Sequence, residues 1–326
     1  MPADVGHADE GSRAASHEAA RYQGRVARRG DRTTTRAPRR AHLVLGTQAP
    51  FRLDLTVLVL QRLFGNPIDV WERGRWVRAF ETPDGPVACE VTQVARRPEI
   101  RAVLTGPAGD LAPWRDRLRR MLGLDVDLAP FHARARRLPA LAPLERRIRG
   151  VRPPRFAALH EAFAAVIPFQ QVSLASGIAM LRRLAASLAP PVVVSGTTVY
   201  PFPDATRLAG ASDAVLRAAG FSAAKALALR SAARAIADGS LRDAELAALP
   251  SGALVERLTE LPGIGPWSAS LLALRYFGRL DVFPPGDAAA VKALVEVGRG
   301  EDLLERLGPW RGMLYYCLFL RRILGA

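Results

Sequence analysis

The chain has 326 residues, of which 49% are hydrophobic, so it is long enough for two domains with substantial cores. Its formal net charge is +15, and almost all of the positive charge comes from arginine. A basic surface favours a polyanionic partner, nucleic acid first, although a coding bias that replaces lysine by arginine is an alternative source of the arginine excess. The two cysteines, Cys89 and Cys317, lie far apart in the sequence and exclude a disulfide framework or a CxxC metal site.

The sequence carries no signal for membrane insertion or secretion. No apolar run approaches the roughly 18 residues that a membrane-spanning helix needs. The N-terminus lacks the apolar core of a secretory signal peptide. We therefore expect a protein of the bacterial cytoplasm, associated with the nucleoid if its polyanionic partner is DNA.

The first third of the chain divides into a polar tail and a region of mixed periodicity. Residues 1–40 contain almost no large apolar residue, which predicts a disordered basic tail that either adds salt-sensitive nucleic-acid affinity or has no role. Residues 41–131 combine strand patterns with two helical patterns, and turn signals lie at residues 73–74 and 83–85. We expect an α+β domain here, an antiparallel sheet with helices. The strand candidates are residues 42–45, 71–72, 76–80, 87–94 and 100–104, and the helix candidates are residues 51–63 and 111–122.

Residues 132–326 predict a second, all-helical domain. Its beginning, residues 133–155, is rich in proline and arginine and predicts a connector with little helix. From residue 156 onwards apolar residues recur with helical spacing. The longer predicted helices cover residues 156–167, 170–188, 222–238, 251–260, 267–277, 288–297 and 310–323.

A turn rich in glycine and proline, Leu261-Pro-Gly-Ile-Gly-Pro-Trp267, joins two of these helices. Gly263 and Gly265 allow positive φ and close approach of another backbone. The first turn of the helix that follows offers amide N–H groups that no helical carbonyl accepts, together with the positive end of the helix dipole, and this combination binds phosphate. The tetrapeptide alone is equally typical of a tight connection in a helical bundle.

An extended loop, Arg279-Leu-Asp-Val-Phe-Pro-Pro-Gly-Asp287, follows the hairpin and leads into the helix of residues 288–297. Hairpin, helix, loop and acid in this order resemble the helix-hairpin-helix DNA glycosylases, which cut damaged bases from DNA. Segments at residues 122–125, 167–173 and 220–226 extend the resemblance to the type II 3-methyladenine, alkylation-repair subgroup. The resemblance covers the chain from about residue 41 to its end and implies the α+β and helix-hairpin-helix domains of that family.

The resemblance implies that Asp287 is the catalytic acid. A base must be flipped out of the stack before its glycosidic bond can be attacked. A carboxylate beside that bond stabilises the positive charge that develops on the sugar, and it can orient or deprotonate water. The alternative is that Asp287 caps the helix that begins at Ala288, and both roles are compatible. Asp281, at the start of the loop, is assigned no chemistry.

Trp267 indicates the reaction type. Glycosylase-lyases of this fold carry at this place a lysine that attacks the sugar, whereas tryptophan has no nucleophile. We therefore expect a monofunctional enzyme that uses water. An alkylated purine is cationic and stacks on aromatic faces. The candidate walls of the base pocket are Trp267, Phe319, Tyr316 and Phe169, each of which is alternatively an ordinary core residue.

The remaining candidates would hold DNA. The hairpin residues Pro262, Gly263, Ile264, Gly265 and Pro266 would bind phosphate through their backbone. In the family a side chain near Gln170 and Gln171 fills the gap left by the flipped base; here Gln171 is the candidate wedge, or an ordinary surface glutamine. Lys225 would bind phosphate or lie on a solvated helix face.

We expect no resident metal and no other cofactor. Cys317 alone excludes the iron–sulfur cluster that some relatives hold on four cysteines. The resemblance implies a monovalent cation held by hairpin carbonyls.

The sequence therefore predicts a monomeric, monofunctional DNA glycosylase for base excision repair. It would hydrolyse the N-glycosidic bond of alkylated purines such as 3-methyladenine and 7-methylguanine in double-stranded DNA and leave an abasic site. One alternative is a glycosylase of the same fold for deaminated or oxidised bases. The other is a non-catalytic DNA-binding module, against which the acid Asp287 argues.

Overall fold

The computed structural model describes residues 39–94, 97–298 and 300–325. The disordered tail predicted for residues 1–40 lies outside these residues apart from Arg39 and Arg40, and Arg40 already belongs to the first strand. The residues from Arg39 onwards form one compact unit. Whether this unit divides into two domains at residue 131 stays a prediction.

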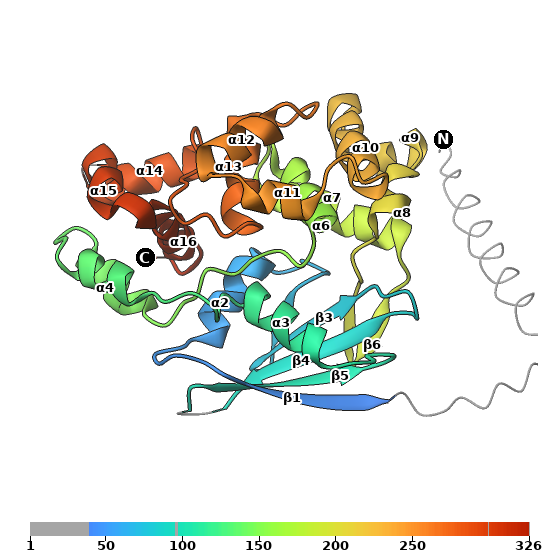
Figure 1. The fold of residues 1–326 in the computed structure, drawn as a ribbon, viewed down its shortest axis with the longest axis horizontal. Helices are drawn as coiled ribbons and strands as arrows, with labels where there is room; N and C mark the ends of the chain where they lie inside the picture. Colours follow the sequence, from blue (N-terminus) through green and yellow to red (C-terminus); the bar gives the residue numbers. More distant parts are fainter. Residues whose placement is uncertain (1–38, 95–96, 299, 326) are drawn as a thin grey trace, which may run out of the picture. The chain divides into compact units, whose positions relative to one another are not determined.

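A five-stranded antiparallel sheet dominates the N-terminal region (Figure 1). Its strand order is β1-β5-β4-β3-β2, and β1 pairs with β5 so that Leu43 lies opposite Ala102. Buried and exposed side chains alternate along β1 and β5, as they do in strands with one covered face. The elements are β1 (Arg40–Gly46), α2 (Leu53–Gln61), β2 (Val70–Glu72), β3 (Arg75–Phe80), β4 (Val87–Gln93), β5 (Glu99–Thr105) and α3 (Ala112–Met121). The predicted α+β region is confirmed.

Fifteen helical elements and one small ribbon follow among the described residues. They are α4 (Ala129–Arg136), α5 (Ala142–Ile148), α6 (Leu159–Val166), η1 (Ile167–Phe169), α7 (Leu174–Leu188), β6 (Val192–Val194), β7 (Thr197–Val199), α8 (Ala205–Ala209), α9 (Asp213–Ala218), α10 (Ala223–Ala237), α11 (Asp243–Ala248), α12 (Ser251–Thr259), α13 (Pro266–Arg275), α14 (Ala288–Val297), α15 (Gly300–Leu307), η2 (Gly308–Trp310) and α16 (Arg311–Ile323).

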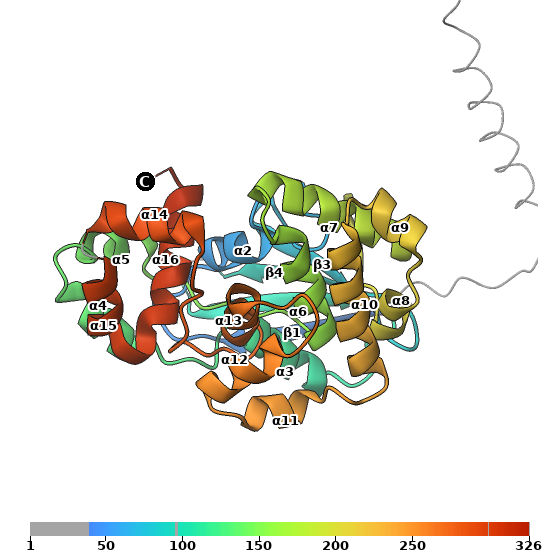
Figure 2. The same cartoon turned by 90° about the horizontal axis from the view of Figure 1, so that it is seen from above.

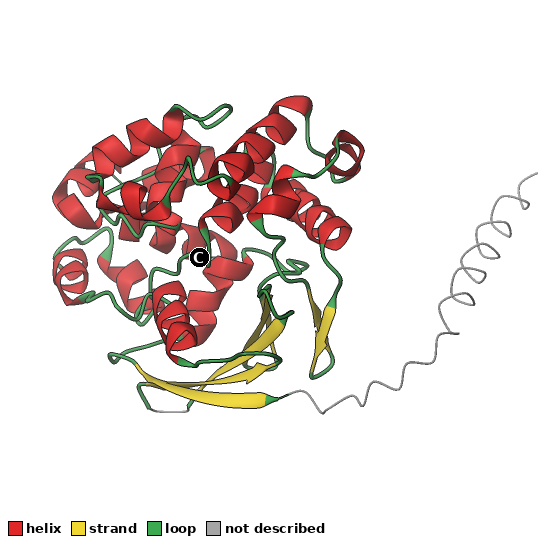
Figure 3. Cartoon of the chain, turned by 45° about the vertical axis from the view of Figure 1, so that its right-hand side comes forward, coloured by secondary structure: helices red, strands yellow, loops and turns green. Residues whose placement is uncertain are grey.

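Two local predictions in this part are wrong. The predicted connector of residues 133–155 contains α5 and the second half of α4, because the prolines of these helices occupy the first turn, where a helix tolerates them. The ribbon β6–β7 interrupts the region predicted to be all helical (Figure 3). Val194 and Val199 of the ribbon pack against the sheet residue Val77, so this ribbon covers part of the sheet.

Two hydrophobic cores share helix α2. Leu55 and Val59 belong to the core of the helical region, whereas Leu53 and Val57 pack between the sheet and α3. Seen from above, α14, α15 and α16 gather on one side of α13, and α7, α8, α9 and α10 gather on the other (Figure 2). This arrangement places the beginnings of α7, α10, α13 and α14 around one cavity.

Candidate active site

The helix-hairpin-helix turn exposes its backbone and buries one side chain. Pro262, Gly263, Gly265 and Pro266 are exposed, whereas Ile264 is buried in the core. Pro266 begins α13, where its missing N–H costs no hydrogen bond. The amide groups of the first turn of α13 therefore lie at an exposed surface that suits a phosphate.

Gly263 fits tightly against α10. Its φ is +73°, and a Cβ placed there would lie 2.7 Å from the Cβ of Ala228. At Gly265 no described residue lies within 4 Å of such a Cβ. The first glycine is therefore required by packing, and the second leaves open space beside the backbone.

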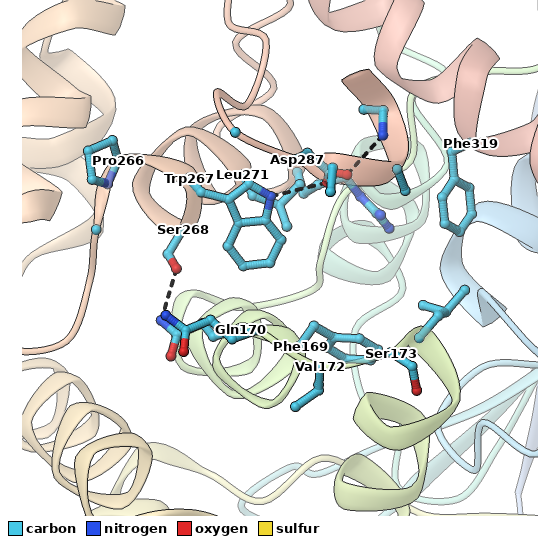
Figure 4. Close-up of a pocket in the computed structure, with 18 of the residues that line it drawn as sticks. Phe169, Gln170, Val172, Ser173, Pro266, Trp267, Ser268, Leu271, Asp287 and Phe319 are labelled. Atoms are coloured by element: carbon cyan, nitrogen blue, oxygen red, sulfur yellow. Dashed lines mark hydrogen bonds between the residues drawn. The ribbon is translucent and has the colours of Figure 1, made fainter. Parts of the chain in front are cut away.

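Gln170 fastens the hairpin to the neighbouring segment. Its Nε2 donates to the carbonyl of Gly263 at 2.8 Å and to Oγ of Ser268 at 2.9 Å (Figure 4). Gln171 is exposed and has a positive φ of 54°, so the chain turns sharply beside the cavity. Nζ of Lys225 donates to the carbonyl of Pro168 at 3.1 Å, and desolvation lowers the pKa of this lysine.

Asp287 is both a helix cap and a cavity residue. Its Oδ1 accepts from the amide of Ala290 at 3.0 Å, which caps α14. Its Oδ2 accepts from Nε1 of Trp267 at 3.1 Å and from the hydroxyl of Tyr315 at 2.9 Å. Three donors therefore fix the orientation of the carboxylate.

The prediction that Tyr316 lines the pocket is wrong, and the adjacent Tyr315 lines it instead. Tyr316 is fully buried in the core, where its hydroxyl donates to the carbonyls of Pro154 at 3.3 Å and Leu274 at 3.4 Å. Burial raises its pKa to about 12. Successive residues of a helix point about 100° apart, so it is Tyr315 that lines the cavity. Burial and the nearby carboxylate of Asp287 raise the pKa of Tyr315 well above its ordinary value, and its hydroxyl stays a donor.

The cavity has a volume of about 880 Å³. Trp267 and Phe319 lie on opposite sides of it, and Asp287 lies between them (Figure 4). Phe169 forms part of a third side, close to Val172. The volume is within the range of small-molecule sites and suits a flat ring of the size of a nucleobase.

Two buried arginines in the cavity wall were not predicted. Arg62 follows α2, and its guanidinium lies 4.1 Å from the ring centre of Phe169. Arg275 ends α13, and its guanidinium lies 4.8 Å from the ring centre of Phe156. Both side chains are buried, and neither forms an ion pair within the described part of the chain. Because Arg62 precedes the turn that begins at Leu261 by 199 residues, no local pattern connects the two.

Metal ligands do not gather anywhere in the described ranges: these contain no cluster of three or more His, Cys, Asp or Glu side chains that could hold a metal ion. None of the helices in the same ranges is long and apolar enough to cross a membrane.

Residues 164–302 match the model of the HhH-GPD superfamily of base excision DNA repair proteins. The hairpin, α13, the loop and Asp287 all lie within these residues. This part of the chain is therefore a domain of the HhH-GPD superfamily, and the resemblance inferred from the hairpin and the loop is confirmed.

Among curated proteins, a DNA-3-methyladenine glycosylase of Bacillus subtilis is 26% identical over 202 residues, which cover 60% of this chain and 67% of that protein. DNA-3-methyladenine glycosylase 1 of Schizosaccharomyces pombe is 36% identical over 95 residues, or 29% of this chain and 41% of that protein. A probable bifunctional transcriptional activator and DNA repair enzyme of Mycobacterium tuberculosis is 29% identical over 194 residues, which cover 58% of this chain and 37% of that protein.

Solved structures share the whole arrangement. A 3-methyladenine DNA glycosylase from Archaeoglobus fulgidus superposes with a TM-score of 0.72 and 23% identity, over 86% of this chain and 98% of that one. An 8-oxoguanine glycosylase/lyase of Clostridium acetobutylicum, solved with double-stranded DNA, superposes with a TM-score of 0.68 and 16% identity, over 89% and 99%. At identities this low, the similarity shows only that the chains share a fold, in which a sheet and a helical region occur together.

Proposed function

We propose that this protein is a monofunctional DNA glycosylase that hydrolyses the N-glycosidic bond of an alkylated base in duplex DNA. The observation that carries the proposal is the carboxylate of Asp287, which is held by Trp267 and Tyr315 between two aromatic walls and beside an exposed hairpin backbone. The names of the curated relatives support alkylated bases as the substrate class.

The hairpin would hold the DNA. Its exposed backbone amides would bind a phosphate without reading the sequence, so that one nucleotide comes to lie at the mouth of the cavity. The carbonyl oxygens of Leu261 and Gly263 each accept one hydrogen bond and keep a second lone pair, which fits the monovalent cation expected there.

The flipped base would stack between Trp267 and Phe319, with its sugar next to Asp287. As the glycosidic bond breaks, its electron pair leaves with the base and positive charge grows on the sugar. The ionised carboxylate stabilises that charge and orients a water molecule that attacks the anomeric carbon. The carboxylate cannot turn away while Trp267 and Tyr315 both donate to the same oxygen.

A lyase step needs an amine that attacks the sugar. Trp267 stands where the bifunctional relatives would place their lysine, and Lys225 is the one lysine among the described residues that line the cavity. The amine of Lys225 is engaged with the carbonyl of Pro168. Both observations support hydrolysis without strand cleavage.

The test is the product formed from methylated duplex DNA under single-turnover conditions. We expect free methylated base and abasic sites that break only after alkali, with no covalent complex trapped by borohydride. Strand breaks before alkali, together with a trapped complex, would show a lyase. Failure to release base from any alkylated duplex would contradict alkylated bases as the substrate class.

A further inference from the structure

A second hollow adjoins the active-site cavity and lies between α14 and α16. These two helices pack side by side (Figure 2), and the hollow between them has a volume of about 450 Å³. Ala288, Ala289 and Arg322 line both this hollow and the cavity that contains Asp287. The two spaces are therefore neighbours at the start of α14, and we call the second one the α14–α16 groove.

The α14–α16 groove carries an excess of positive charge. Lys292, Arg321 and Arg322 line it together with one acid, Glu296. Nη1 of Arg321 pairs with this acid at 2.6 Å. Lys292 and Arg322 are exposed, and neither forms an ion pair with another of the residues that the structure describes. The other lining residues are alanines and one glycine, which carry no charge, so two cations remain available to an anionic group.

The groove and the hairpin flank the cavity on different sides. Trp267 and Phe319 lie on opposite sides of the cavity (Figure 4). The hairpin leads directly into Trp267, whereas Arg322 follows Phe319 on α16 by three residues, or about one helical turn. A base stacked between the two rings would therefore have the hairpin backbone on one side and the groove on the other. Because the DNA backbone continues in both directions from a flipped nucleotide, its phosphates would pass both features.

We propose that the α14–α16 groove is a second phosphate site, in which Lys292 and Arg322 hold the DNA backbone on the side of the flipped nucleotide that the hairpin does not reach. This inference rests on the proposed function, which puts the flipped base between Trp267 and Phe319. The damaged strand would then be held on both sides of the lesion. Such contacts fix the position of the strand and contribute affinity without reading its sequence.

Removing single charges from the DNA tests the proposal. The probe is a duplex in which a stable tetrahydrofuran abasic analogue replaces the lesion, and a neutral methylphosphonate replaces one phosphate at a time on either side of it. Dissociation constants are measured for the wild type and for Lys292→Gln/Arg322→Gln. At the phosphate held by the groove, the methylphosphonate should weaken wild-type binding by about 3- to 10-fold and have no further effect on the variant. At the phosphate held by the hairpin, both proteins should lose affinity equally.

The salt dependence of binding to the unsubstituted probe is an independent measurement. Each phosphate contact contributes about 0.9 to the slope with which log affinity falls against log salt concentration. The slope of Lys292→Gln/Arg322→Gln should therefore be smaller than that of wild type by about 0.9 or more. Arg73→Gln/Arg97→Gln is the matched control, because it also removes two exposed cations, but from loops of the sheet that line neither the cavity nor the groove. Its slope should equal that of wild type.

Two results would overturn the second phosphate site. One is an equal loss of affinity in wild type and Lys292→Gln/Arg322→Gln at every methylphosphonate position, and the other is a salt slope of this variant that equals the slope of the control. Neither measurement requires base release, so the site and the proposed function can fail separately. A groove phosphate found in a protein that releases no alkylated base would support the site and contradict the function, whereas base release without a groove phosphate would contradict the site alone.

Discussion

The carboxylate of Asp287 receives hydrogen bonds from side chains 20 and 28 positions away in sequence. One donor comes from the first turn of α13 and the other from α16, so the acid is oriented by two helices at once. Its other oxygen caps α14. The helix cap and the proposed catalytic role therefore use the same geometry, because a carboxylate fixed at the start of α14 is also held facing the cavity.

Replacing Tyr315 by phenylalanine removes one donor to Oδ2 and leaves the aromatic ring in place. We expect base release to slow by about 10-fold or more, because the carboxylate loses part of its orientation. Duplex affinity should be unchanged. Single-turnover rates and gel-shift titrations measure the two quantities separately.

Tyr316→Phe is the control for this change. It removes a hydroxyl from the adjacent residue, whose hydrogen bonds of 3.3 and 3.4 Å point into the core. Its rate should match wild type. Equal slowing in both variants would mean that loss of packing, rather than the contact to Asp287, lowers the rate.

Most of the site residues that the sequence predicted are brought together by the structure. Asp287, Trp267, Phe319 and Phe169 all line the same cavity. Tyr316 failed because helical periodicity does not say which of two adjacent tyrosines faces a cavity. The sequence did not predict that Arg62 lines the cavity, because this residue follows α2 and is brought there by packing between segments distant in sequence. The roles of all these residues in chemistry remain predictions.

At the scale of elements, the two hairpin glycines have different tasks. Gly263→Ala forces a Cβ to within 2.7 Å of Ala228 at a positive φ, so we expect a loss of about 1–3 kcal/mol in the free energy of unfolding. Gly265→Ala meets no described residue within 4 Å, so stability should change by less than about 0.5 kcal/mol. Its methyl group would instead obstruct an approaching phosphate and weaken duplex binding several-fold.

Denaturant melts and duplex titrations on both variants separate these effects. The control is Gly252→Ala in α12, which also meets open space but lies outside the turn. If Gly265→Ala binds duplex as tightly as wild type, the hairpin backbone is not the phosphate site.

Element prediction failed where a local signal was weighed wrongly. Residues 192–199 carry three valines, a Ser-Gly turn and a second β-branched run, which is a hairpin signal that the helical context obscured. Pro143 lies in the segment interpreted as a connector with little helix, although it stands in the first turn of α5, as Pro130 does in α4. The antiparallel sheet and the hairpin helices were predictable, because their periodicity and turns agree.

At the scale of the whole molecule, a buried ion network links the sheet to the helices. Arg78 on β3 donates to Asp69 at 2.9 Å and also pairs with Glu161 on α6. All three groups are buried. Helix α2, shared by both cores, forms a second connection. The sequence did not predict this network, because one of its two ion pairs joins residues that lie 83 positions apart.

Glu161→Gln keeps the shape of the side chain and removes one partner of the buried arginine. We expect a loss of about 3–5 kcal/mol in the free energy of unfolding, because a buried charge loses part of its compensation. Asp54→Asn, which breaks the exposed pair with Arg52 at 2.6 Å, should cost at most about 1 kcal/mol. Urea unfolding of both variants measures the difference, and equal losses would contradict the structural role given to the network.

The most direct measurement is single-turnover base release from alkylated duplex DNA by wild type and Asp287→Asn side by side. Asparagine caps a helix as well as aspartate does, so α14 and the fold should persist while the negative charge is lost. We predict that Asp287→Asn binds the duplex and melts like wild type but releases no base. Release at the wild-type rate would show that Asp287 is a helix cap alone and would contradict the proposed mechanism.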